Sequence, residues 1–241
     1  MNGVLKSAIA ELLGTFTLVF VGGMVVTVAP QFGVVAAALG HGLILIGIIY
    51  AYGHISGAHF NPAVTAGLLV GGKIDLPKAV IYWVMQFVGA IIAAVLVRFF
   101  VDSLPNAAEV LTTINYGVTK GSLTDDAIVP AALIEFILAF LLVSTIYQAA
   151  VFGKAGNLAP VAIGFTLAGL ILAAGAYTGA SVNPARTLGP ALIAGDLSYV
   201  PAYFVALFAG GIVAGLLHAY VIGNVQELPP KVEPTERIPN R

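Results

Sequence analysis

The sequence of 241 residues contains no cysteine and very little charge. The absence of cysteine excludes disulfide bonds, thiolate metal sites and cysteine nucleophiles. Asp, Glu, Lys and Arg make up 9% of the residues, whereas about 25% is usual in a soluble domain. So little charge cannot cover a water-facing surface, which excludes a soluble enzyme and a disordered chain. The net charge of −1 also argues against a nucleic-acid partner, because nucleic-acid backbones are bound by basic patches.

Long uncharged runs occupy most of the chain, and 59% of all residues are hydrophobic. Residues 12–72 contain no Asp, Glu, Lys or Arg at all. A helix needs about 20 apolar residues to cross a bilayer, and turn residues divide the runs into segments of that length. We expect membrane spans over residues 4–28, 34–54, 78–101, 127–151, 158–177 and 199–222. The sequence therefore predicts an all-α, multi-pass membrane protein and excludes a single-span receptor.

Two further apolar segments, residues 61–70 and 183–194, are too short to cross. As helices they would extend about 15–18 Å, roughly half of the hydrocarbon core. Both begin with the same tripeptide, Asn61-Pro62-Ala63 and Asn183-Pro184-Ala185. Asn is a good N-cap and Pro is favoured at the first helical position. We expect two re-entrant half-helices.

The two halves of the chain repeat each other. Residues 42–63 and 164–185 align with 11 identities, at an offset of 122. The predicted organisation is a first repeat over residues 1–105, a connecting extracytoplasmic loop over 106–126, a second repeat over 127–222 and a flexible cytoplasmic tail over 223–241. Each repeat has three spans, an odd number, so the second must insert upside down. An inverted 3+3 repeat with broken helices places its functional site at the midplane.

The basic residues predict the orientation. Seven of the ten Lys and Arg residues fall on the side that holds both termini. They are Lys6, Lys73, Lys78, Lys154, Lys231, Arg237 and Arg241. Since basic loops stay inside, we expect both termini in the cytoplasm, with the protein in the cell membrane.

Irregular backbone at membrane depth is tolerated only inside protein or against a water-filled cavity. We expect the stretches before the half-helices to present carbonyls to such a cavity, from Gly57, Ala58, His59, Phe60, Gly179, Ser181 and Val182. The Asn61 and Asn183 amides would donate hydrogen bonds into it, beside two positive helix N-termini. Arg186 follows the second tripeptide, and a charge inside the membrane usually marks a pathway. The pattern predicts a device that conducts neutral polar molecules and rejects cations, including protons.

The stretches His54–Val64 and Gly179–Arg186 resemble the signature motifs of the aquaporin (major intrinsic protein) family, and the likeness extends to about residue 222. The resemblance implies a passive water channel without enzymatic activity or cofactor, assembled as a homotetramer in lipid. It also implies a selectivity filter at His41, Ile171, Ala180 and Arg186. This filter is similar to that of the tonoplast-intrinsic branch, many of whose members pass water and often ammonia. Thr187 and Ala191 differ from the residues typical of the glycerol branch.

Glu11 and Glu135 occupy equivalent places in the two repeats, deep in the first and fourth spans. We expect them to be structural, accepting hydrogen bonds from backbone N–H groups that would otherwise be unsatisfied in lipid. An alternative makes them coupling groups of an ion- or proton-coupled secondary transporter, since such transporters share inverted repeats. A third possibility is a non-conducting junction protein on the same scaffold.

Overall fold

The structure is a computed structural model that describes residues 3–27, 29–108, 111 and 115–223. In these ranges six helices are long and apolar enough to cross a membrane, which confirms the predicted spans. They are α1 (Gly3–Val26), α2 (Ala29–Ser56), α4 (Leu76–Asp102), α6 (Ile128–Ile146), α7 (Ala159–Thr178) and α9 (Val200–Leu217). The predicted tail from residue 224 onward and part of the predicted 106–126 loop lie outside the described residues.

Several helix ends differ from the simple pattern. The π-helical turns η2 (Tyr147–Val151) and η4 (His218–Ile222) continue α6 and α9, and the 3₁₀ turn η3 (Gly156–Leu158) precedes α7. Near its start α2 is broken at Gly33, where φ is 68°. Because that backbone conformation favours glycine, Gly33 marks where the straight part of the second span begins.

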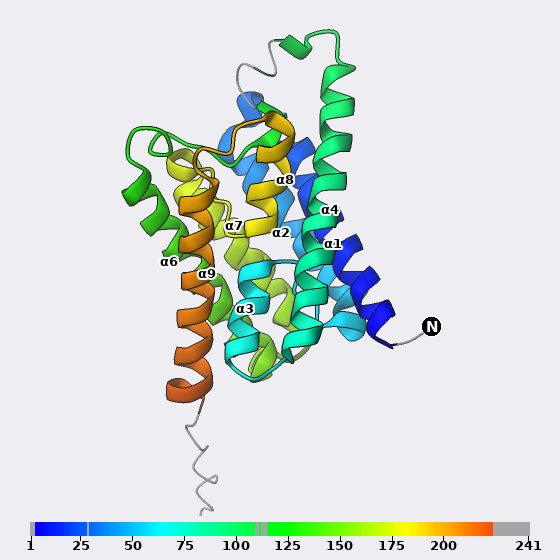
Figure 1. The fold of residues 1–241 in the computed structure, drawn as a ribbon, viewed down its shortest axis with the longest axis vertical. Helices are drawn as coiled ribbons and strands as arrows, with labels where there is room; N and C mark the ends of the chain where they lie inside the picture. The colour runs from blue at the N-terminus through cyan, green and yellow to red at the C-terminus, as the bar shows by residue number, and fades with distance from the viewer. Residues whose placement is uncertain (1–2, 28, 109–110, 112–114, 224–241) are drawn as a thin grey trace, which may run out of the picture.

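The two short helices α3 (Pro62–Val70) and α8 (Pro184–Ala194) lie inside the bundle, one above the other (Figure 1). Both open as predicted, with an extended asparagine as N-cap and proline at the first turn. Each half-helix packs on the last span of the other repeat, α3 against α9 and α8 against α4. The two repeats are therefore interlocked.

Close contact with α9 positions α3. A Cβ atom at Gly215 would lie 2.2 Å from the Gly67 carbonyl oxygen, and one at Gly211 would lie 2.3 Å from the Ala63 carbonyl oxygen. No side chain fits in either place, so glycine lets the two backbones touch, as in other membrane helix crossings. This contact fixes the depth of the half-helix.

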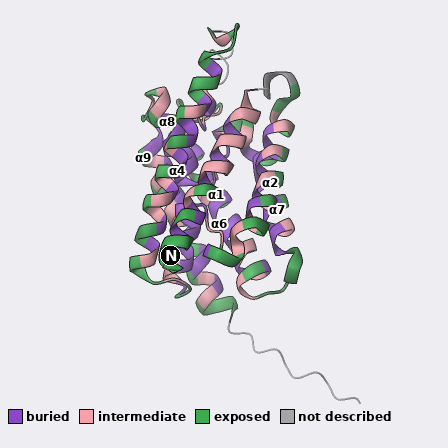
Figure 2. Ribbon diagram, turned by 90° about the vertical axis from the view of Figure 1, so that its right-hand side faces the viewer, coloured by how far each residue is buried: buried purple, intermediate pink, exposed green. Residues whose placement is uncertain are grey.

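The molecule has its apolar side chains outside and several of its polar ones inside. Exposed residues cover the outer faces of the long helices, and buried residues face the centre (Figure 2). Large apolar side chains such as Leu43, Phe165 and Val205 are 58%, 60% and 73% exposed. Glu11 and Glu135, by contrast, are fully buried. This distribution suits a protein surrounded by lipid.

Candidate functional site

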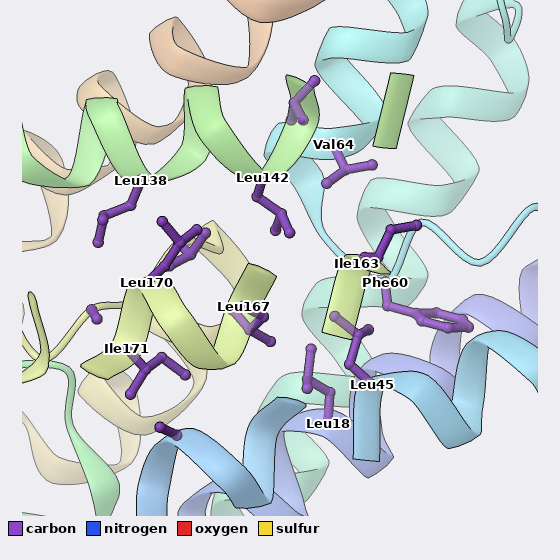
Figure 3. Packing of buried hydrophobic residues seen from close by; sticks show 14 of the residues in the cluster. Leu18, Leu45, Phe60, Val64, Leu138, Leu142, Ile163, Leu167, Leu170 and Ile171 are labelled. Carbon is purple, nitrogen blue, oxygen red and sulfur yellow. The ribbon is translucent and has the colours of Figure 1, made fainter. Parts of the chain in front are cut away.

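A cavity of about 570 Å³ lies inside the bundle. Its wall includes His41 and Arg186 at one end, the two half-helix caps Asn61 and Asn183, and Lys73 toward the cytoplasmic end predicted above. Much of the remaining wall is apolar. Figure 3 shows Leu45, Val64, Leu142 and Leu167 converging from α2, α3, α6 and α7, and all four border the cavity.

The two asparagines tie the repeats together at the level where the half-helices begin. The Asn61 side-chain oxygen accepts from the N–H of Ala63 at 2.9 Å, and its Nδ2 donates to the Val182 carbonyl at 2.9 Å. Asn183 makes the equivalent two bonds in the second repeat. Its side-chain oxygen accepts from the N–H of Ala185 at the start of α8, and its Nδ2 donates to the Phe60 carbonyl at 2.9 Å. An amide carries two N–H donors. One of each pair thus crosses to the opposite loop, and one remains for the cavity.

The predicted carbonyl-bearing loops adopt unusual backbone conformations. Ala58 and Phe60 have φ values of 53° and 48°, and Ala180 and Val182 have values of 41° and 59°. Residues other than glycine adopt this left-handed region at a cost and only where their surroundings hold them. The same alternation in both loops points to a shared structural requirement.

Most of the predicted loop residues border the cavity. They are Gly57, Ala58, His59, Ser181 and Val182. Phe60 and Gly179, and the predicted filter residue Ala180, are not among the residues that line it. The Phe60 ring is fully buried and its carbonyl is bonded to Asn183, whereas Gly179 lies against the backbone of Thr119.

Glu11 holds the first loop. Its two carboxyl oxygens accept from the Ser56 hydroxyl at 2.7 Å and from the backbone N–H groups of His59 and Phe60 at 3.0 and 2.7 Å. The Gln86 side chain donates a further bond at 2.8 Å. The left-handed loop is thereby fixed to α1 and α4.

Glu135 holds the second loop in the same way. It accepts from the Thr178 hydroxyl at 2.7 Å and from the N–H groups of Ser181 and Val182 at 2.9 Å each. These contacts match the structural role expected for both carboxylates. The loop N–H groups, which would be unsatisfied in lipid, all have acceptors.

Two tyrosines complete this support and were not predicted from the sequence. Tyr82 donates its hydroxyl to the Ser56 carbonyl at 2.7 Å, and Tyr203 donates to the Thr178 carbonyl at 2.9 Å. The two contacts are equivalent, but Tyr82 and Tyr203 lie 121 residues apart, whereas the internal alignment has an offset of 122 and pairs Tyr82 with Phe204. Extending the alignment would therefore not have suggested them.

Arg186 is only 5% exposed and makes two side-chain hydrogen bonds. Its Nε donates to Nε2 of His41 at 3.2 Å, and its Nη1 donates to the Gly117 carbonyl at 2.6 Å. His41 Nδ1 lies 2.8 Å from the Ala37 carbonyl. Since a carbonyl only accepts, Nδ1 must carry the proton and Nε2 must be the acceptor. His41 is therefore a neutral partner that orients the guanidinium.

The other filter positions of the sequence prediction also lie near this end. Ile171 borders the cavity, and Ala180 is buried in the adjacent apolar cluster. His41 fits because Gly22 faces it: a Cβ atom there would lie 2.1 Å from Nε2. The Gly117 carbonyl was not predicted from the sequence, because a main-chain acceptor in an irregular loop leaves no residue pattern.

Metal binding has no support in the part of the chain that the structure describes, where no three His, Cys, Asp or Glu side chains gather. The chemistry available at the site is hydrogen bonding and the fixed charge of Arg186.

Comparison with known proteins agrees with this geometry. The family model of the major intrinsic proteins matches residues 2–218. Aquaporin TIP2-3 of Arabidopsis thaliana is 38% identical, over 92% of this chain and 90% of its own. Aquaporin TIP1-2 of Zea mays is 37% identical, over 88% and 84%.

Among solved structures, the aquaglyceroporin from Plasmodium falciparum matches with a TM-score of 0.79 at 25% identity. The match covers 91% of this chain and 97% of that one. Together with the paired half-helices and their reciprocal asparagines, these matches show that the chain belongs to the major intrinsic protein family, the aquaporins.

Proposed function

We propose that this passive water channel rejects protons and other ions at two levels of its cavity, the meeting point of the half-helices and the Arg186 constriction. The observation that carries the proposal is the reciprocal bonding of Asn61 and Asn183 to Val182 and Phe60. This bonding leaves one amide N–H on each asparagine, at the positive ends of two helices.

Water passes the asparagines in one orientation. Its oxygen accepts from both amides, so its own hydrogens point away along the cavity. The neighbouring wall includes Val64, Leu142 and Leu167, whose side chains carry no hydrogen-bonding group that would turn the molecule. Each helix N-terminus carries about half a positive charge, which opposes hydronium and metal ions. Pore diameter, donors and electrostatic barriers together set selectivity in such channels.

Arg186 supplies the second barrier. Its guanidinium donates to permeating molecules with the N–H groups that His41 and Gly117 leave free. Because His41 is neutral, the constriction keeps a full positive charge. Small neutral molecules pass it, and cations are repelled.

Osmotic measurement tests the proposal. Purified protein in proteoliposomes is mixed with hyperosmotic buffer in a stopped-flow light-scattering instrument. We expect water permeability well above that of empty vesicles, with a low activation energy and no effect of ion gradients or a protonophore. Saturable flux that collapses with a protonophore would favour the secondary transporter, and correctly inserted protein without added permeability would favour the junction protein.

Ammonia is a second permeant that we propose. Ile171 is aliphatic and Ala180 is small, so the constriction has no bulky aromatic at either position. The substitution His41→Phe is expected to narrow it and to lower ammonia flux relative to water flux at least about threefold, which corresponds to about 0.7 kcal/mol. The ratio is measured from internal alkalinisation and osmotic shrinkage in one vesicle preparation. An unchanged ratio would remove His41 from the selectivity mechanism.

The orientation and assembly are further proposals. Both termini lie on the cytoplasmic side, as the distribution of basic residues favours, and four chains form a homotetramer in lipid. Since the chain has no cysteine, single-cysteine reporters labelled from either side test the orientation, and native mass spectrometry tests the tetramer. The cell membrane remains the location predicted from sequence. The filter's resemblance to the tonoplast-intrinsic branch favours an internal membrane instead, and a fluorescent fusion distinguishes the two.

A further inference from the structure

Residues 115–124, which we name the outer strap, cross the ends of α7, α8 and α9 that face away from the predicted cytoplasmic side. The strap includes the 3₁₀ turn η1 (Asn115–Gly117). It is joined to α7 by bonds from the N–H of Ser122 to the Ala176 carbonyl at 3.0 Å and from the N–H of Leu123 to the Tyr177 carbonyl at 2.9 Å. At its start lies Gly117, whose carbonyl accepts from Arg186.

The backbone that presents this carbonyl is strained. Asn115, Tyr116 and Gly117 have consecutive φ values of 39°, 56° and 77°. Such a run of left-handed residues, two of them not glycine, persists only where the surroundings hold it. The strap must therefore be fixed on both sides of Gly117.

Lys120 fixes the strap on one side. Its Nζ donates to Asp196 Oδ2 at 2.8 Å, pairs with Asp125 and lies 5.7 Å from the centre of the Tyr199 ring. Hydrogen bonds from Lys120 and Ser198 lower the pKa of Asp196 to about 2. Asp196 follows the end of α8, the half-helix that carries Arg186 near its start.

Tyr116 fixes the strap on the other side. Its hydroxyl donates to Asp102 Oδ1 at 2.8 Å, at the end of α4. The Arg98 guanidinium lies 5.3 Å from the centre of the Tyr116 ring, and its Nη1 donates to the Ile193 carbonyl at 3.2 Å. This second anchor thus also reaches α8.

We propose that Lys120 and Tyr116 are positioning residues that hold the Gly117 carbonyl on Arg186 and thereby set the selectivity of the outer constriction. The inference rests on the proposed role of Arg186. When the carbonyl withdraws, Nη1 loses its acceptor and the long arginine side chain gains alternative rotamers. The constriction then widens for solutes larger than water.

A purely stabilising role does not account for these contacts. The Lys120–Asp125 pair is open to water, since the Asp125 side chain is 66% exposed, and exposed ion pairs contribute little to stability. Lys120 and Tyr116 instead lie on either side of Gly117, whose carbonyl accepts from Arg186. Loss of either anchor is expected to change which solutes pass more than it changes folding.

The test compares glycerol and water permeability of reconstituted variants in one stopped-flow instrument. Lys120→Met keeps the length of the side chain and removes its charge, Lys120→Arg restores the charge, and Tyr116→Phe removes only the hydroxyl. The matched control is Asp126→Asn, an exposed acid in the segment that follows the strap. Insertion is checked by gel filtration and protein-to-lipid ratio.

We expect Lys120→Met to raise the glycerol-to-water ratio at least about fivefold, which corresponds to about 1 kcal/mol. Tyr116→Phe should raise it less, and Lys120→Arg and Asp126→Asn should keep the wild-type ratio. A wild type that conducts water, with a Lys120→Met ratio no different from that of Asp126→Asn, would overturn the inference and leave the proposed function intact. A wild type without water permeability would overturn the proposed function itself. If Lys120→Met does not insert, an unchanged ratio in Tyr116→Phe overturns the inference.

Discussion

Arg186 lies at one end of the cavity and keeps its full charge there, because both of its side-chain partners are uncharged. The neutral His41 ring and the Gly117 carbonyl satisfy hydrogen bonds without forming an ion pair. Burying a charge without an ion pair is costly, so a side chain held in this way is more useful to permeation than to stability.

The first prediction is that Arg186→Val makes the channel leak cations and protons. A unit charge at about 5 Å contributes about 3 kcal/mol at an effective dielectric constant of about 20, so the leak should rise at least about tenfold. A pH-sensitive dye inside proteoliposomes measures it under an imposed potential. Arg186→Lys, which keeps the charge, is the control. A leak at the wild-type level in Arg186→Val would show that the barrier lies elsewhere.

The carboxylates give the second prediction. In Glu135→Gln one acceptor oxygen becomes an NH₂ group, so a loop N–H loses its partner at a cost of about 1–3 kcal/mol. We expect a lower melting temperature in detergent, with Glu11→Gln behaving alike and Asp126→Asn unchanged. Any water flux that these two variants retain should stay independent of ion gradients. An unchanged melting temperature together with altered ion dependence would instead support the transporter reading.

At the scale of elements, the half-helices were predictable because their signals are local. The short length, the capping asparagine and the proline at the first turn can all be read from the half-helix itself or from the residue just before it. The outer strap was not predictable in the same way. Its left-handed residues and the acceptor at Gly117 depend on Lys120, Tyr116 and partners on distant helices.

The third prediction concerns the contact of α3 with α9. The substitution Gly215→Ala places a methyl group 2.2 Å from the Gly67 carbonyl oxygen, so the helices must separate. Overpacking of this kind costs about 1–3 kcal/mol, and we expect a lower melting temperature and reduced water permeability. In Gly169→Ala, where nothing lies within 4 Å, both should be retained. Equal effects of the two substitutions would show that the close contact does not position α3.

At the scale of the whole molecule, the span number, the repeat and the interior placement of the site followed from composition and periodicity. The hydrogen bonds that join the two repeats at the asparagines could not be predicted in this way. Asn61 to Val182 and Asn183 to Phe60 join residues 121 and 123 positions apart, and no short pattern specifies a partner at that separation. The sequence predicted that each amide donates a hydrogen bond into the cavity, but it did not predict that a second N–H of each joins the repeats.

The last prediction follows from the absence of cysteine in the whole chain. Mercuric chloride should leave water permeability unchanged. Ile171→Cys places a thiol on the cavity wall and should confer inhibition that a thiol reductant reverses. Leu172→Cys, at a side chain that is 47% exposed, is the matched control on the outer face. Inhibition of the wild type would require a different site of attack.

The exchanged asparagine bonds also bear on how the chain is made. Each repeat supplies the carbonyl acceptor for the capping asparagine of the other repeat, so neither repeat can satisfy these hydrogen bonds alone. During synthesis the first three spans enter the bilayer with the Asn61 amide and the Phe60 carbonyl still hydrated, and these groups remain so until the last half-helix arrives. Biogenesis should therefore pass through a loosely assembled intermediate that closes in one late step, and a ribosome stalled after the third span would yield a product open to quality-control proteases.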